Sequence, residues 1–223
     1  MHLIDLRAYL SELAENNNRA WFVMNKPRYD ILRAEFLQFV SDLQQQISRY
    51  DGAIAACEAK KAIFRINRDV RFAHDKSPYK TQFSAALNPT NRKKPSEGGG
   101  PMYYLQFDGQ GKLFFACGEY IPPAERLQQI RQHIVKDSAG FKKVIKDKKM
   151  LAAFGGLQSE EKLLRPPKGY DAEHEFIEFI KFKSFLVRQE IDYTKLNSEQ
   201  ALKTLAAAFK DAQVLVQWLR AAS

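Results

Sequence analysis

The sequence has little cysteine and no long hydrophobic run. Only Cys57 and Cys117 occur among 223 residues. Neither has a second cysteine or a histidine at metal-ligand spacing, so reduced core thiols are favoured over a disulfide or a metal site. The apolar runs are far shorter than the roughly 20 residues that cross a bilayer, and charges interrupt the N-terminal segment where a signal peptide would be apolar. We therefore expect a soluble, cytoplasmic protein without a membrane partner.

Common metal and catalytic motifs are missing as well. The four histidines are scattered, and no two of them have HxH or HxxxH spacing. The sequence contains no GxSxG nucleophile motif. The glycines at 98–100 are not followed by a Lys-Ser or Lys-Thr pair, so they predict a mobile loop rather than a phosphate loop. We predict no metal and no cofactor.

Positive charge is the most evident surplus. Thirty-five lysines and arginines against 26 acids give a net charge of +9. Much of it is local, in the basic loop at residues 92–94 and in a lysine-rich helix at residues 142–149. Each segment is read either as solvated surface or as a contact surface for a phosphate backbone, and charge alone does not decide between them.

The apolar pattern predicts an α+β fold. Helical spacing marks residues 3–13, 27–49 and, after an Asn197–Gln200 capping box, a terminal helix to residue 219. Strand patterns occupy residues 64–72, 81–87, 102–107 and 112–120, whereas residues 176–185 fit a helix, a strand or a helix that passes into a strand. We expect a single domain over residues 1–223, with an antiparallel sheet of about four to six strands packed against N-terminal and C-terminal helices.

The segment at residues 64–81 is unusually charged for a strand and turn. Charges that leave water need partners, so this density indicates either a solvated face or a network around something bound. Strand alternation would place Phe64, Ile66, Val70 and Phe72 on one face. Arg68 falls on that apolar face, which predicts that it is buried or half-buried and paired with an acid, unless a bulge near Asp69 resets the register.

Four blocks of the sequence carry a family resemblance. They are Asn16-Asn17-Asn18-Arg19-Ala20-Trp21-Phe22 with Asn25 and Tyr29; Arg68-Asp69-Val70-Arg71-Phe72 with Asp75-Lys76-Ser77-Pro78-Tyr79-Lys80; Gly118 with Tyr120 and Pro122; and Arg165-Pro166-Pro167-Lys168-Gly169-Tyr170 with Lys181 and Lys183-Ser184-Phe185. With these blocks the chain resembles the DUF2461 family of uncharacterised bacterial and fungal proteins, although Met102 stands where the family usually has glycine. The resemblance implies one α+β unit of no established activity.

The second and fourth blocks supply the candidate site. Arginine and lysine donors suit a phosphate or carboxylate, so we predict a small anionic ligand, bound with or without catalysis. The candidate ligand-binding residues are Arg68, Arg71, Lys76, Tyr79, Lys80, Lys168, Tyr170, Lys181 and Lys183. Asp69 and Asp75 are weaker candidates for a general base.

Two other interpretations remain open. In the first, Asp69 and Asp75 only neutralise nearby cations in an ion-pair network that fixes the turn at Ser77-Pro78. In the second, the protein is a nucleic-acid-binding module that uses the basic loop and the lysine-rich helix. These interpretations differ from the anion site in salt response and in how Arg71 affects stability.

Overall fold

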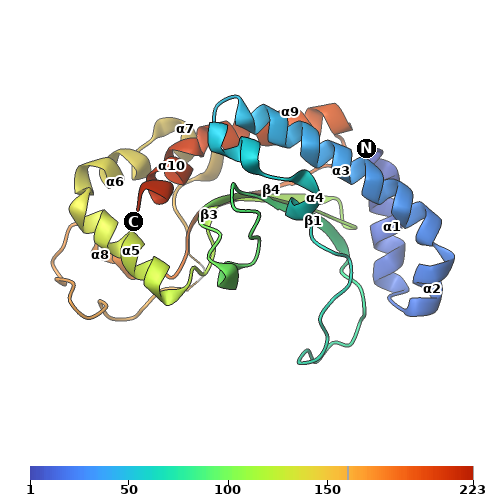
Figure 1. Ribbon diagram of the computed structural model, residues 1–223, viewed down its shortest axis with the longest axis horizontal. Helices are drawn as coiled ribbons and strands as arrows, with labels where there is room; N and C mark the ends of the chain where they lie inside the picture. The colour runs from blue at the N-terminus through green and yellow to red at the C-terminus, as the bar shows by residue number, and fades with distance from the viewer. Residues whose placement is uncertain (160, 223) are drawn as a thin grey trace.

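The computed structural model, which describes residues 1–159 and 161–222, consists of an antiparallel sheet beneath a layer of helices (Figure 1). This arrangement confirms the predicted α+β class. The strands lie in the order β1-β2-β3-β4. They are β1 Gln82–Leu87, β2 Met102–Asp108, β3 Lys112–Glu119 and β4 Phe185–Asp192.

Helices precede and follow the first three strands. The N-terminal ones are α1 Leu3–Glu15, α2 Arg19–Met24, α3 Lys26–Ser48 and α4 Ala59–Ala62. The later ones are α5 Ala124–Lys136, α6 Ser138–Ile145, α7 Lys148–Phe154, α8 Ile177–Ile180, α9 Ser198–Asp211 and α10 Gln213–Ala221. Among the described residues, none of these helices has the length and apolar character that a bilayer crossing requires.

Local sequence signals explain where the two long helices begin. Pro27 lies in the first turn of α3, where its missing N–H leaves no internal hydrogen bond unmade. Asn197 and Gln200 form a reciprocal capping box at the start of α9. The predicted terminal helix is divided, because the chain turns at Ala212 and α10 continues in a new direction.

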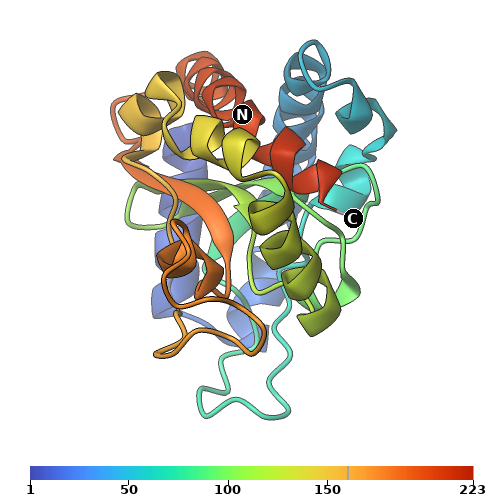
Figure 2. The same cartoon turned by 90° about the vertical axis from the view of Figure 1, so that its left-hand side faces the viewer.

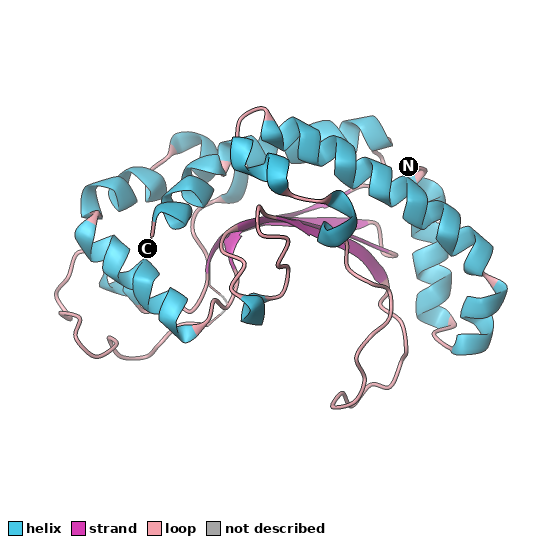
Figure 3. Cartoon of the chain, viewed as in Figure 1, coloured by secondary structure: helices cyan, strands magenta, loops and turns pink. Residues whose placement is uncertain are grey.

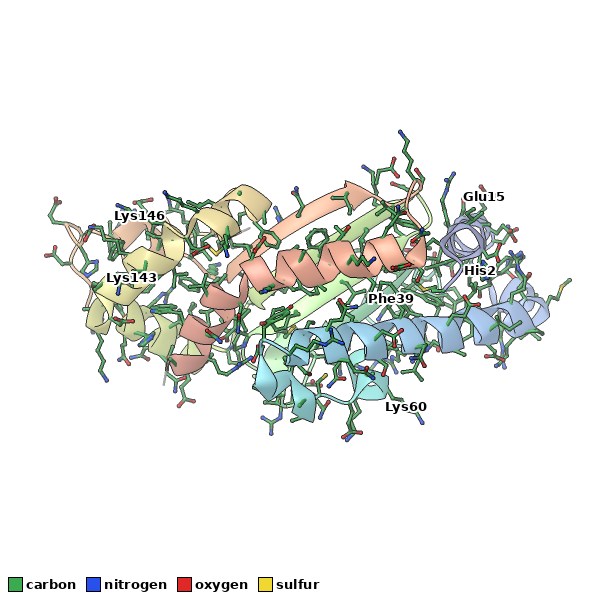
Figure 4. The ribbon with its side chains drawn as sticks, turned by 90° about the horizontal axis from the view of Figure 1, so that it is seen from above. His2, Glu15, Phe39, Lys60, Lys143 and Lys146 are labelled. Atoms are coloured by element: carbon green, nitrogen blue, oxygen red, sulfur yellow. The ribbon has the colours of Figure 1, made fainter. Side chains whose placement is uncertain are left out.

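One face of the sheet forms the core against α3 and α9. The two helices lie side by side across the strands in the view from above (Figure 4). Tyr103 of β2 packs against Phe209 of α9, with 5.3 Å between ring centroids, and Phe107 packs against Phe39 of α3 at 5.6 Å. These side chains alternate along β2 with residues that point to the other face, as strand geometry requires.

The opposite face of the sheet is only partly covered. Among the described residues, mainly loops lie below it (Figure 3). Tyr104, Gln106 and Phe114 on this face are therefore half-buried, whereas their neighbours on the helical face are buried. We call this surface the open face.

The prediction of a strand at residues 64–72 is wrong. The segment makes isolated bridges, Ile63 with Ala85 and Asn67 with Tyr79, and then extends away from the sheet as an excursion (Figure 1). Phe72, expected on an apolar face, is 94% exposed. Alternation defines a strand only where a neighbouring strand supplies a ladder, and residues 68–78 have none in the described chain.

The ambiguous segment at residues 176–185 is a short helix followed by a strand. Helix α8 ends at Ile180, and β4 begins at Phe185 and pairs with the whole of β3. Residues 188–192 are largely polar and lie in an edge strand. The hydrophobic pattern of the sequence therefore did not predict a strand there.

A buried polar network joins three distant parts of the fold. Asp51, which follows α3 and is only 3% exposed, accepts two hydrogen bonds from Arg220 of α10, at 2.8 and 2.9 Å. The hydroxyl of Tyr103 donates a third, at 2.9 Å. Burial alone would raise the pKa of Asp51, but the bonds from Arg220 and Tyr103 outweigh it and hold the pKa below its usual range.

We expect Arg220→Met to lower the free energy of unfolding by about 3 kcal/mol, because it leaves a buried carboxylate without its cation. The depressed pKa of Asp51 stabilises the folded state above the unfolded pKa near 3.9, and this contribution is lost as pH falls through the folded pKa. The stability difference between variant and wild type should therefore shrink in acid. Urea denaturation at pH 7 and pH 3 measures it.

The matched control is Lys203→Met, which breaks the exposed Lys203–Glu199 pair within α9. Exposed pairs contribute little, so this variant should differ from wild type by less than about 0.5 kcal/mol. Equal losses in the two variants would contradict a structural role for the Asp51 network.

Candidate functional site

Asp69 and Arg71 pair with each other near the end of the excursion. The Nε and Nη2 atoms of Arg71 donate to the two Asp69 oxygens at 2.9 and 2.7 Å. These hydrogen bonds lower the pKa of Asp69 to about 2. A carboxylate with so low a pKa is a weak proton acceptor, which argues against using Asp69 as a general base.

Arg68 and Asp75 fix the turn that precedes Pro78. The side chain of Arg68 pairs with Asp75 and also donates to the backbone oxygen of Ser77 at 3.2 Å. Asp75 accepts from the backbone N–H and the hydroxyl of Ser77, and these bonds, followed by that from Arg68, lower its pKa. The predicted half-buried, acid-paired Arg68 is thus confirmed, and the amine of Lys76 donates to the backbone of Val70.

Tyr79 is a structural link between the first two family blocks. Asn17 donates to the Tyr79 carbonyl at 2.9 Å and accepts from its N–H at 3.0 Å. The Tyr79 ring is buried and stacks on Phe22 of α2, with 4.0 Å between centroids. Asn18 caps α2 through the N–H of Trp21. The asparagine triplet therefore binds the N-terminal helices to the base of the excursion.

The late candidates are mostly engaged at the other end of the sheet. Lys181 pairs with Glu178, and Lys183 pairs with Glu161, each at 2.7 Å. Lys168 is exposed, whereas Tyr170 is half-buried and lies near Arg131. The structure does not bring these residues to the excursion, because Ile63 bridges to Ala85 of β1 and Gln158 bridges to Leu186 of β4, at the two opposite edges of the sheet.

A pocket of about 340 Å³ lies on the open face. The central strands β2 and β3 form its floor, and Phe64 and the loop at residues 93–95 form part of its wall. Apolar and aromatic groups dominate the lining, as in most small-molecule sites. The lining includes Phe64, Pro95, Met102, Tyr104, Phe114, Ala116, Tyr120 and Leu186.

Two lysine amines lie near the Phe64 ring, Lys93 as part of the pocket lining and Lys80 beside it. The Nζ atoms of Lys80 and Lys93 are 5.1 and 5.3 Å from the centroid of the Phe64 ring. Phe64 in turn contacts Tyr104 edge-on. Among the described residues, no carboxylate lies within ion-pair distance of either amine. Burial is the largest cause that lowers the pKa of both lysines, and neighbouring cations lower it further.

Hydrogen bonds hold the basic loop over the pocket. The Lys93 amine donates to the carbonyls of Lys61 and Ile63 at 2.7 and 2.6 Å. Asn88, fully buried, donates to the Arg92 carbonyl. Gly99 passes so close to that carbonyl that a Cβ would lie 2.1 Å from its oxygen. The glycines that predicted a mobile loop here instead permit a close backbone approach.

Arg188 of β4 brings a further cation to the pocket. Its partner across the β3–β4 ladder is Ala116, whose neighbour on β2 is Tyr104. The Nε of Arg188 donates to the side-chain oxygen of Gln158 at 3.0 Å. The pocket therefore has cationic groups from both edges of the sheet and an apolar floor between them.

None of the nine residues predicted to bind a ligand is in the described lining of this pocket, although Lys80 contacts the Phe64 ring beside it. Tyr104, Gln106 and Phe114 could have been found from the period-two pattern, which separates them from the buried residues beside them. Phe64 and Lys93 reach the pocket only because their segments, which lie outside the sheet strands, fold against β2 and β3. No local sequence pattern encodes this contact. In the described part of the chain, no three or more metal-ligating side chains gather at one place.

The two basic segments of the nucleic-acid interpretation lie apart. The loop at residues 92–94 borders the open face, whereas α6 and α7 belong to one end of the helical layer (Figures 2 and 4). Lys143 and Lys146 mark that end. One continuous surface across both segments is therefore not formed by the fold.

We expect Arg68→Ala to lower Tm by about 3 °C, because it leaves the turn at Ser77 without its charged donor. Arg71→Ala should leave Tm within about 1 °C of wild type, because Arg71 is 76% exposed against 27% for Arg68. Thermal unfolding followed by circular dichroism distinguishes the two. A large loss for Arg71→Ala would instead assign Arg71 a structural role.

Comparison with known proteins identifies the family but no better-known relative. The family model of the conserved hypothetical protein DUF2461 matches residues 5–218. No curated protein and no solved structure matches the chain. Because the match covers nearly the whole sequence, including the excursion and the strands of the pocket, the chain belongs to the DUF2461 family.

Proposed function

We propose that the open-face pocket binds a small anionic ligand that has an aromatic or apolar body. The observation that carries this proposal is the pairing of an apolar floor with two lysine amines that have no carboxylate partner among the described residues. Half-buried cations without acids are costly for a folded protein, and a bound anion would offset that cost.

The shape of the pocket suggests how such a ligand would lie. Its planar or apolar part would contact Tyr104, Phe114 and Ala116 on the floor, and its phosphate or carboxylate would lie towards Lys80 and Lys93. A volume of about 340 Å³ is at the small end of ligand pockets, which favours a metabolite over a polymer. Of the nine predicted ligand-binding residues, this proposal retains Lys80 beside the pocket.

The two cysteines bear on where this binding would occur. Both are free and buried. Unpaired thiols are typical of reducing compartments, so the proposal places the function in the cytoplasm.

Phenyl phosphate should raise Tm more than inorganic phosphate, and neutral phenol should raise it least. Only phenyl phosphate has both a ring to contact the apolar floor and an anion to pair with the lysine amines. Lys80→Met should weaken phenyl phosphate binding about tenfold, the cost of one charge-assisted contact. Thermal shift and calorimetric titration measure these effects.

Two further variants make this experiment specific. Ala116→Phe should fill the pocket and abolish binding, since Ala116 points into it from β3. Lys76→Met is the matched control, because Lys76 has the same charge but lies on the excursion and bonds to Val70. Equal affinity of the Ala116→Phe variant and wild type would refute this pocket as the binding site.

A second candidate function is nucleic-acid binding through α6 and α7 alone. The supporting observation is that the exposed lysines Lys143, Lys146, Lys148 and Lys149 form no ion pair with the described residues, whereas Lys142 pairs with Glu175. Such lysines would contact phosphates rather than read bases.

If this second candidate holds, polarization binding of a labelled DNA duplex should weaken steeply between low and moderate salt. Replacing the four unpaired lysines with glutamine should reduce the slope of log affinity against log salt by up to about 4. The control replaces four exposed residues elsewhere, Lys26, Lys60, Lys195 and Lys203. Affinity that salt leaves unchanged would rule out this candidate.

A further inference from the structure

We propose that Lys80 is a nucleophilic amine that forms an imine with the carbonyl group of an anionic aldehyde or ketone. This inference rests on the proposed anion pocket and names the class of its ligand. It gives Lys80 a covalent role in addition to charge recognition.

The surroundings of Lys80 differ from those of an ordinary surface lysine. The residue lies just before β1, and its backbone N–H is fixed by a 2.8 Å hydrogen bond to the Ile66 carbonyl. Its amine lies against the Phe64 ring, which also lines the pocket. No hydrogen-bond acceptor or carboxylate holds this amine among the described residues.

Lys93 provides an internal comparison. Its amine contacts the same Phe64 ring but donates to two backbone carbonyls, which fix its position. The Lys80 amine has no such acceptor among the described residues. The fold thus places one fixed cation and one unbonded amine around a single aromatic ring.

The surroundings of the Lys80 amine lower its pKa, which enlarges the neutral, nucleophilic fraction. Burial is the main cause that lowers its pKa, and the charges of Arg65 and Lys93 lower it further. Desolvation next to another cation is an established way to activate a lysine for attack on carbonyls. Lys93 would then both depress the proton affinity of Lys80 and attract the anionic group of the ligand.

The reaction requires no reagent beyond the ligand and water. The lone pair of the neutral amine attacks the carbonyl carbon, so a C–N bond forms as the C=O π bond opens, and one amine proton passes to the oxygen to give a carbinolamine. The C–O bond then breaks, the hydroxyl leaves as water with the second N–H proton, and the C=N bond of the imine forms. No atom is oxidised or reduced in the sequence.

Borohydride trapping on the full chain tests the proposal. Pyridoxal 5′-phosphate, which has both an aldehyde and a phosphate, is added at limiting concentration and the imine is reduced to a stable amine. Peptide mass spectrometry should find Lys80 modified at least tenfold faster than the exposed Lys76 and Lys143. Modification spread evenly over surface lysines would overturn the proposal. This measurement on wild type does not depend on any variant folding.

A second arm separates this inference from the proposed pocket. Lys80→Arg removes the nucleophile and should lose the rapid modification. The control Lys76→Arg, on the excursion, should keep both the modification of Lys80 and phenyl phosphate binding. If phenyl phosphate binds to wild type and Lys80 is not selectively modified, the imine fails and the anion pocket stands. If phenyl phosphate does not bind either, both fail.

Discussion

The one-sided burial of the sheet determines most of this structure. Helices α3 and α9 cover the face that carries Tyr103 and Phe107. Among the described residues, no second helical layer of comparable extent covers the face that carries Tyr104 and Phe114. An antiparallel sheet tolerates this arrangement because its side chains alternate between a core and a less covered surface. The open face is consequently the place where loops and ligands can approach the strands.

Much of the fold could be predicted from sequence because local signals agree there. The first and third helices, the capping box at Asn197 and the three strands that end near Leu87, Phe107 and Glu119 all follow from period and cap residues. The failures have two causes. The excursion at residues 64–81 alternates like a strand, but among the described residues it makes only isolated bridges. The second half of β4, residues 188–192, is largely polar and lies on an edge strand, so it has no hydrophobic pattern.

The candidate site, like the fold, could be predicted from the sequence only in part. Charge density indicated Lys80, whose role in ligand binding stays a prediction, and strand alternation led to the expected pairing of Arg68 with an acid, which the structure contains. Neither pattern could show that Asp69 and Arg71 pair with each other on the excursion. The late lysines were grouped with them by family blocks, and topology separates them to opposite edges. The pocket arises where residues distant in sequence fold over a sheet, which is information that spacing does not contain.

The two isolated bridges beside the sheet have a consequence for self-association. Ile63 pairs with Ala85 at the outer side of β1, and Gln158 pairs with Leu186 at the outer side of β4. Each bridge occupies part of an edge that could otherwise accept a strand from another molecule. The irregular segments that border the pocket thus also interrupt the edges through which antiparallel sheets aggregate.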